Sequence, residues 1–201
     1  DADCVIECIV EIQEIKENLF RQLSDLVGED VILCTNSSYM VSSLFADCVK
    51  NPARLCNMHF FNPAPNMKLV EVIAGANTSA ELVQKIKDLS VELGKTPVEV
   101  NEAPGFVVNR ILAALKKEAR WLVENGYCTF EEVDIAMEYG FNHKMGPFRL
   151  NDLTGIDLSF TMMKTRYEQT GVKPDMYDVY EQMVKEGRLG RKTGHGFYDY
   201  E

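Results

Sequence analysis

The stretch that decides the fold runs from Lys68 to Val100 and reads KLVEVIAGANTSAELVQKIKDLSVELGKTPVEV. It begins with an apolar strand pattern, Lys68 to Ile73, and continues into a helix pattern from Ser79 to Leu93 that Gly94 closes. Pro97 to Val100 then gives a second strand pattern. A helix between two apolar strands is typical of α/β proteins with a mainly parallel sheet and helices on its faces.

The same alternation extends upstream to the first residues of the chain. The patterns predict two further strand–helix pairs and one more strand: strands at 3–10, 31–34 and 55–61, and helices at 13–26 and 42–49. The small polar residues of Thr35-Asn36-Ser37-Ser38 suit a turn from a strand into a helix, because their hydroxyls can cap the helix. We therefore predict an α/β domain over residues 1–103.

From Phe106 onward the pattern contains helices only. Periodic apolar residues predict four of them, at 107–124, 130–139, 157–170 and 176–185, followed by a glycine-rich tail. Pro104-Gly105 is the natural hinge between the two halves. The predicted fold class is thus α/β followed by all-α, with a helical domain over residues 104–201.

Composition and charge narrow the function classes. With 46% hydrophobic and 26% charged residues the chain is expected to form a real core rather than to be disordered. No apolar run approaches the roughly 20 residues of a membrane span, and no signal peptide is visible. The net charge of −10 disfavours nucleic acid and anionic lipid as partners.

The cysteines point to a reducing compartment. They lie in apolar contexts without the CxxC spacing of zinc sites, so we interpret them as reduced thiols and expect no metal: Cys4, Cys8, Cys34, Cys48, Cys56 and Cys128. The expected location is the cytoplasm.

His59 and Glu71 are the strongest candidates for chemistry. His59 ends a predicted strand, where parallel α/β sheets place their ligands, and Glu71 lies in the next strand. A carboxylate on one imidazole nitrogen fixes the tautomer and leaves the other nitrogen free to take a proton from an alcohol. From spacing alone, a surface or structural histidine is the favoured interpretation.

Two further polar residues are candidates for the site, and the usual phosphate-binding motifs do not occur in the sequence. Ser37 ends its strand in the same topological position as His59, although a helix cap is the favoured interpretation from the sequence alone. Asn109 is polar in an apolar helix start, where it either reaches a site or satisfies nearby backbone. No GxGxxG turn and no P-loop occurs, so a dinucleotide fold would need its phosphate-binding turn upstream of Asp1.

Four segments together resemble the 3-hydroxyacyl-CoA dehydrogenase family, and most closely its short-chain bacterial members that act on 3-hydroxybutyryl-CoA. They are HFFNPAPNMKLVEVI (59–73), EAPGFVVNRIL (102–112), MGPFRLNDLTGID (145–157) and GRLGRKTGHGFYDY (187–200). The resemblance covers essentially all 201 residues. It implies a Rossmann-type NAD-binding domain followed by a helical domain that dimerises and closes over the substrate cleft.

The resemblance also implies an activity: reversible oxidation of a 3-hydroxyacyl-CoA to a 3-oxoacyl-CoA with NAD, NADP being left open. His59 then corresponds to the general base and Glu71 to the residue that orients it. Ser37 and Asn109 match the substrate-positioning serine and asparagine. The remaining cofactor contacts of the family fall on Glu11, Lys16, Asn62 and Lys192. The implied partners are an acyl-CoA and a second copy of the chain.

Two departures from the family pattern stand out. The family motif Asn-Thr-Ser-Ser reads Thr35-Asn36-Ser37-Ser38 here, which we interpret as a swap that leaves both serines in place. The glycine-rich turn and the acidic ribose-binding residue of the family would lie upstream of Asp1. The chain thus looks like the C-terminal two-thirds of the enzyme, with an incomplete parallel sheet. We expect the isolated chain to bind NAD poorly or not at all.

Two alternatives stay open from the sequence. One is a non-catalytic dimerisation or interaction module derived from this family, against which the presence of His59, Glu71, Ser37 and Asn109 argues. The other is a segment of a multifunctional fatty-acid oxidation enzyme, which the tail ending at Glu201 fits less well.

Overall fold

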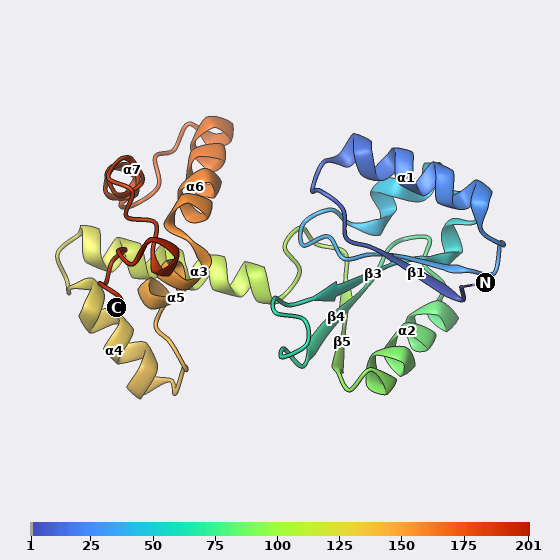
Figure 1. The fold of residues 1–201 in the computed structure, drawn as a ribbon, viewed down its shortest axis with the longest axis horizontal. Helices are drawn as coiled ribbons and strands as arrows, with labels where there is room; N and C mark the ends of the chain where they lie inside the picture. Colours follow the sequence, from blue (N-terminus) through green and yellow to red (C-terminus); the bar gives the residue numbers. More distant parts are fainter. Residues whose placement is uncertain (1) are drawn as a thin grey trace. The chain divides into compact units, whose positions relative to one another are not determined.

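The alternating strands and helices of the first half form a five-stranded sheet (Figure 1). The structure is a computed structural model that describes residues 2–201, and the chain divides into two units, Asp1–Arg110 and Ile111–Glu201. In the first unit the strands lie side by side in chain order: β1 (Cys4–Glu7), β2 (Ile32–Thr35), β3 (Leu55–Phe60), β4 (Leu69–Ala74) and β5 (Thr96–Asn101). The mainly parallel sheet is confirmed, with one exception: β3 and β4 are antiparallel.

The antiparallel pair has a simple cause. Residues 61–68 alone connect β3 to β4, whereas a parallel crossover needs a dozen residues or more. The chain therefore turns back on itself, and the register places His59 opposite Glu71. Directly opposite residues of an antiparallel pair project from the same face of the sheet.

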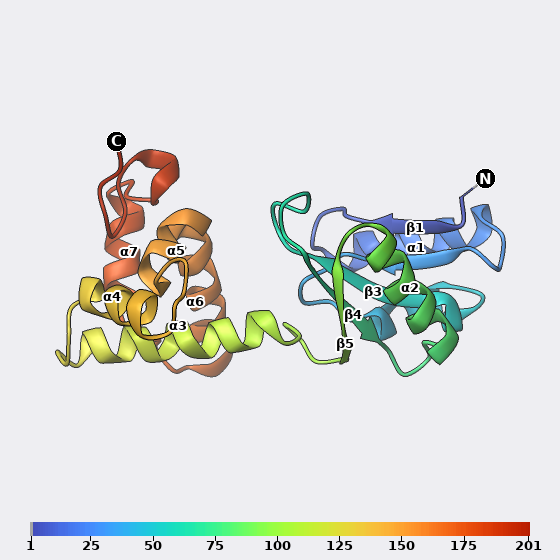
Figure 2. The same ribbon diagram turned by 90° about the horizontal axis from the view of Figure 1, so that it is seen from below.

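Helices cover both faces of the sheet (Figure 2). On one face lie α1 (Gln13–Leu26) and the 3-10 helices η1 (Ser42–Cys48) and η2 (Pro52–Arg54); on the other lies α2 (Ala80–Glu92). Successive side chains of β2 point to opposite faces of the sheet and contribute to an apolar cluster on each. Leu33 packs in one cluster with Phe20 and Phe45, and Cys34 packs in the other with Ile86. The helix predicted at 42–49 is thus present as a 3-10 helix.

The second unit is helical, as predicted, and contains one helix that the sequence pattern did not predict. Its helices are α3 (Val108–Glu124), which begins in the first unit, α4 (Phe130–Gly140), α5 (Pro147–Thr154), α6 (Ile156–Thr170), α7 (Tyr177–Lys185) and the 3-10 helix η3 (Arg191–Thr193). The additional helix, α5, begins at Pro147, and the Asp134 carboxylate accepts the amides of Phe148 and Arg149, both at 2.9 Å. A distant side chain thus caps this short helix.

The glycine-rich tail packs into the core of the second unit. Phe197 lies with its ring centroid 4.8 Å from that of Phe148. The buried carboxylate of Asp152 accepts the amides of Phe197 and Tyr198 and the hydroxyl of Tyr200, each at 2.9 Å. A Cβ on Gly196 would come within 2.2 Å of Asp152 Oδ1, so only glycine fits there. The tail is therefore a structural part of this unit.

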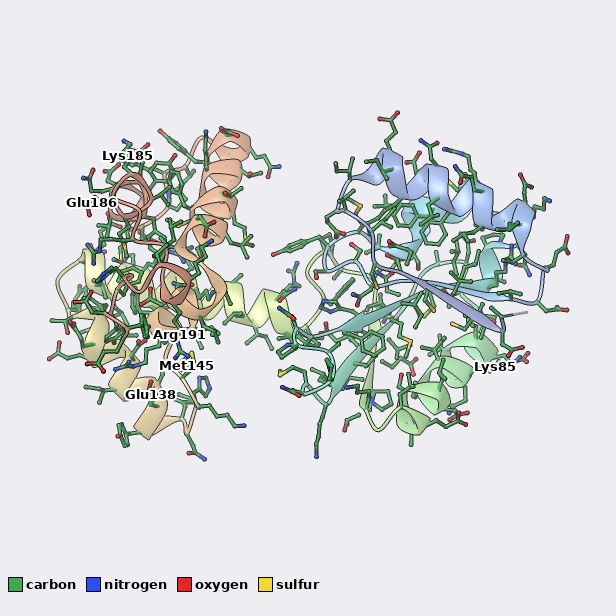
Figure 3. All side chains as sticks on the ribbon, in the orientation of Figure 1. Lys85, Glu138, Met145, Lys185, Glu186 and Arg191 are labelled. Carbon is green, nitrogen blue, oxygen red and sulfur yellow. The ribbon has the colours of Figure 1, made fainter. Side chains whose placement is uncertain are left out.

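The outer surfaces carry exposed ion pairs. Lys85 on α2, labelled in Figure 3, donates to Glu81 at 2.9 Å with both side chains exposed. Exposed pairs of this kind contribute little to the stability of the fold, because solvent and salt screen both charges. Within residues 2–201, no helix has the length and apolarity to cross a membrane.

Candidate active site

His59 and Glu71 form a buried pair at the carboxyl end of β3. His59 Nδ1 lies 2.8 Å from Glu71 Oε2, and the two residues are 3% and 1% exposed. The predicted proximity of these two side chains is confirmed. Since Glu71 holds one ring nitrogen, only Nε2 of His59 is directed at the rest of the site.

The second oxygen of Glu71 is also fully engaged. Oε1 accepts the backbone amides of Val107 and Val108, both at 3.0 Å, where α3 begins. Amides at a helix N-terminus stabilise a negative charge. An ionised Glu71 therefore accepts the Nδ1 proton of His59, which leaves the Nε2 lone pair available to take a proton.

Aromatic rings enclose the imidazole. The ring centroids of Phe61 and Phe106 lie 4.7 Å and 5.4 Å from that of His59. Phe106 is buried and has a left-handed backbone conformation with φ of 47°, which is rare for a bulky residue. Packing against His59 holds this turn in place, and the turn in turn presents the α3 amides to Glu71.

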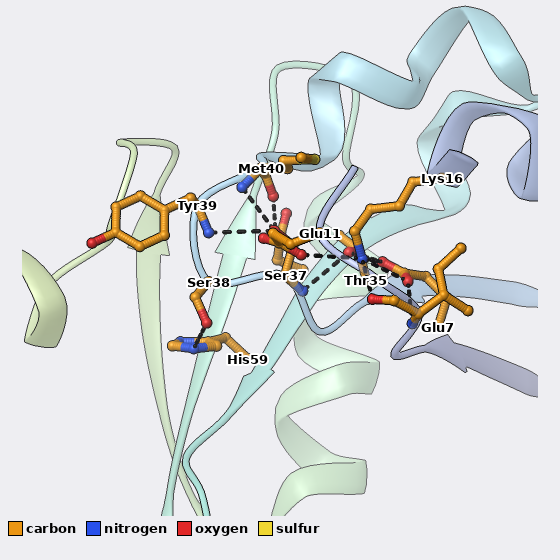
Figure 4. Close-up of polar contacts among 11 residues, drawn as sticks. Glu7, Glu11, Lys16, Thr35, Ser37, Ser38, Tyr39, Met40 and His59 are labelled. Carbon is orange, nitrogen blue, oxygen red and sulfur yellow. Dashed lines mark hydrogen bonds and ion pairs between the residues drawn. The ribbon is translucent and has the colours of Figure 1, made fainter. Parts of the chain in front are cut away.

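Ser38 is the hydroxyl that contacts His59. Its Oγ lies 3.0 Å from His59 Nε2, as Figure 4 shows. The neighbouring Ser37 points elsewhere: its Oγ donates to the Glu11 carboxylate and accepts the amide of Met40 at 2.8 Å. The sequence pattern indicates Ser37, whereas the hydroxyl in contact with His59 is that of Ser38. Adjacent hydroxyls in a turn project in different directions that the sequence does not specify.

One sequence signal was available for Ser38. If Asn36 is aligned with the asparagine of the Asn-Thr-Ser-Ser motif, Ser37 takes the place of the threonine and Ser38 that of the first serine. The structure gives this asparagine a specific task, since Asn36 Oδ1 accepts the amide of Phe60 at 2.8 Å. This contact fixes the turn beside His59, so we replace the interpretation of a swapped motif with this alignment.

The other predicted residues of the first unit lie around the same sheet edge. Asn109 is half-buried in the first turn of α3, directly after the amides that bind Glu71. Asn62 is exposed in the turn after β3, and Glu11 is exposed in the connection between β1 and α1. Lys16 is 1% exposed, and protein oxygens enclose its ammonium.

Lys192 lies in the second unit. Its ammonium donates to both carboxylate oxygens of Asp157, at 2.7 Å and 2.6 Å. The Asp157 pKa is lowered, first by the hydrogen bond from Lys192. A contact between Lys192 and the cofactor would therefore compete with the ion pair to Asp157.

The same sheet edge carries several side chains that can form hydrogen bonds. Glu11, Asn62 and Ser38 present a carboxylate, an amide and a hydroxyl there. The Lys16 ammonium is taken up by Glu7 and Glu11, so Lys16 supplies no free cation for a pyrophosphate.

Comparison with known proteins identifies the family. Residues 1–103 match the NAD binding domain of 3-hydroxyacyl-CoA dehydrogenase, and residues 105–200 match the C-terminal domain of the same family. The whole chain is 44% identical to the 3-hydroxybutyryl-CoA dehydrogenase of Clostridioides difficile, of which it covers 72%. It is also 37% identical to the mitochondrial hydroxyacyl-coenzyme A dehydrogenase of Sus scrofa. That match spans 99% of this chain and 64% of the relative.

A solved structure agrees in fold as well as in sequence. The (S)-3-hydroxybutyryl-CoA dehydrogenase of Ralstonia eutropha superposes with a TM-score of 0.86 at 39% identity, covering 99% of this chain and 71% of that one. The likeness spans both units. This chain therefore belongs to the 3-hydroxyacyl-CoA dehydrogenase family of NAD-dependent oxidoreductases.

Proposed function

We propose that His59 is the general acid/base in the interconversion of 3-hydroxyacyl-CoA and 3-oxoacyl-CoA. The observation that carries this proposal is the buried pair of His59 and Glu71, with Nδ1 tied to a carboxylate and Nε2 facing a serine hydroxyl. NAD, when bound, accepts the hydride from C3 of the hydroxyacyl group.

In the oxidative direction the residues handle the proton. Nε2 of His59 takes the proton of the 3-hydroxyl while the C3–H bonding electrons leave as hydride and the C3–O bond becomes a carbonyl. Glu71 stabilises the imidazolium that results, because its carboxylate remains paired with Nδ1. In the reductive direction the same imidazolium returns the proton to the carbonyl oxygen.

Ser38 is the residue that we assign to the reacting oxygen, in place of Ser37. A substrate hydroxyl that replaces the Ser38–Nε2 contact stays within hydrogen-bond reach of both groups. Asn109 supplies an amide for the thioester end, at the start of the helix whose amides bind Glu71. We expect Ser38→Ala to lower kcat about 10- to 100-fold, and Ser37→Ala to act on turnover less strongly.

The names of the relatives favour a short acyl chain, and 3-hydroxybutyryl-CoA is the proposed substrate. The test is NADH consumption by the full-length gene product with acetoacetyl-CoA, compared with a long-chain 3-oxoacyl-CoA and with free acetoacetate. We expect the highest kcat/KM with acetoacetyl-CoA. A folded sample that turns over none of the three would overturn the proposal.

We also propose that the second unit pairs with a second copy of the chain. Large apolar side chains on and beside α4 are exposed, among them Tyr139 at 85%, Phe141 at 73% and Ile135 at 54%. Exposed apolar groups of this extent are typical of interaction surfaces. Sedimentation at micromolar concentration is expected to show a dimer, and a monomer would contradict the proposal.

A further inference from the structure

A buried ion pair lies at the carboxyl end of β1, apart from His59 and Glu71. Lys16 and Glu7 are 1% and 4% exposed, and the ammonium donates to both carboxylate oxygens of Glu7 at 2.8 Å. A buried ion pair contributes little net stability, since the desolvation of both charges offsets their attraction. The contribution of the pair is therefore better explained by the segments that its two residues bind.

Glu7 ties together the segments that follow β1 and β2. Its Oε2 accepts the amide of Ile9 at 3.1 Å, and its Oε1 accepts the hydroxyl of Thr35. The Thr35 hydroxyl oxygen accepts the amide of Ser37 at 3.1 Å, and the carbonyl of Glu7 accepts the amide of Asn36 at 3.0 Å. Both main-chain and side-chain groups of Glu7 thus hold the turn 35–37.

A second route leads from the same pair to the same turn. Lys16 contacts the Glu11 carboxylate at 3.3 Å, and Glu11 accepts the hydroxyl of Ser37 (Figure 4). With Ser37 bound on one side and Asn36 bound to the end of β3 on the other, Ser38 is left to project toward His59. The contacts of Glu7 therefore converge on the residue next to the catalytic hydroxyl.

We propose that Glu7 is a positioning residue for the reaction, which acts by ordering the turn that aims Ser38 at His59. The inference rests on the proposed function of His59 and Ser38. A displacement of a reacting group by about 1 Å costs up to about 100-fold in rate. We therefore expect Glu7→Gln to lower kcat about 10- to 100-fold, with KM for acetoacetyl-CoA changed less than about threefold.

The experiment compares Glu7→Gln in two backgrounds, the full-length wild type and Ser38→Ala. If Glu7 acts through Ser38, its substitution lowers kcat in the wild type and changes it less than about threefold in Ser38→Ala, because residues that act as one unit are not additive. Glu14→Gln, the same change at an exposed position on α1, is the matched control and is expected to leave kcat unchanged.

Equal losses in both backgrounds would overturn the proposal, since a purely structural role lowers kcat whether or not Ser38 is present. An unchanged kcat in Glu7→Gln would overturn it as well. If Glu7→Gln does not fold, Thr35→Val tests the same route, because it removes only the hydroxyl between Glu7 and the Ser37 amide. Failure of the proposed function is a different result: Ser38→Ala and His59→Gln would then retain wild-type kcat.

Discussion

Replacing Glu71 by glutamine changes one charge and reverses the hydrogen bond to His59. In the wild type the carboxylate can only accept, so Nδ1 of His59 carries the proton and Nε2 is free to take one. In Glu71→Gln, the oxygen of the amide can still accept the two amides of Val107 and Val108. Its NH2 group then faces Nδ1 and donates to it, which moves the ring proton to Nε2.

The magnitude follows from this tautomer. A histidine protonated on Nε2 cannot act as the base, and the same carboxylate-to-amide change in a serine-protease triad lowers kcat about 10⁴-fold. We expect a fall of about 10³- to 10⁴-fold, or roughly 4 to 5 kcal/mol in the activation barrier. The free energy of unfolding changes by only about 1 to 2 kcal/mol, because the number of hydrogen bonds is preserved.

Steady-state oxidation of 3-hydroxybutyryl-CoA by NAD, the direction in which His59 acts as the base, measures the first quantity, and denaturant unfolding measures the second. The expected pattern is a lost kcat with a nearly unchanged KM in a folded protein. A Glu71→Gln variant that retains kcat within threefold of wild type would refute the assignment of Glu71 as the group that sets the His59 tautomer.

Two further predictions concern the stability of the second unit. Burial, together with the charge of Arg120, lowers the pKa of Lys116 from its ordinary value of 10.5 to about 8. Between these two pH values the unfolded state binds more protons than the folded state. The free energy of unfolding of the wild type therefore rises with pH across this window. Lys116→Met removes the cost of burying a charged ammonium. It is expected to raise the free energy of unfolding at pH 7 by about 1 to 2 kcal/mol, after allowance for partial exposure. A lower free energy of unfolding in urea at pH 7 would contradict this reasoning. Gly196→Ala places a methyl group within 2.2 Å of the hydrogen-bonded carboxylate of Asp152 and is expected to destabilise this unit by about 2 to 4 kcal/mol, whereas an unchanged thermal midpoint would show that the tail can move away from Asp152.

The predicted elements were those with long periodic patterns. The helix expected at 13–26 is α1 with the same bounds, and the helix expected at 79–93 is α2, with the hydroxyl of Ser79 accepting the amide of Leu82 as its cap. In both helices an apolar face packs on the sheet, so local pattern and tertiary packing agree. Helix α5 escaped prediction because the Asp134 carboxylate that caps it lies on α4.

The part of the candidate site that could be predicted is the pair of residues placed by the end of β3 and its register with β4. His59 and Glu71 meet because residues 61–68 force β3 and β4 into an antiparallel pair, and the shortness of that connection can be seen in the sequence. The direction of Ser38 could not be seen, because it depends on contacts from Glu7, Glu11 and Asn36 that come from three separate parts of the chain. Such networks of buried polar groups become visible only once the strands are assembled.

The most direct test of the chemistry is the turnover of acetoacetyl-CoA by NADH in full-length His59→Gln, measured beside the wild type on samples with matching unfolding curves. We predict that kcat falls by at least about 10³-fold, since glutamine neither takes nor returns the proton at the position of Nε2. A folded His59→Gln variant that turns over within threefold of wild type would contradict the assignment of His59 as the general acid/base.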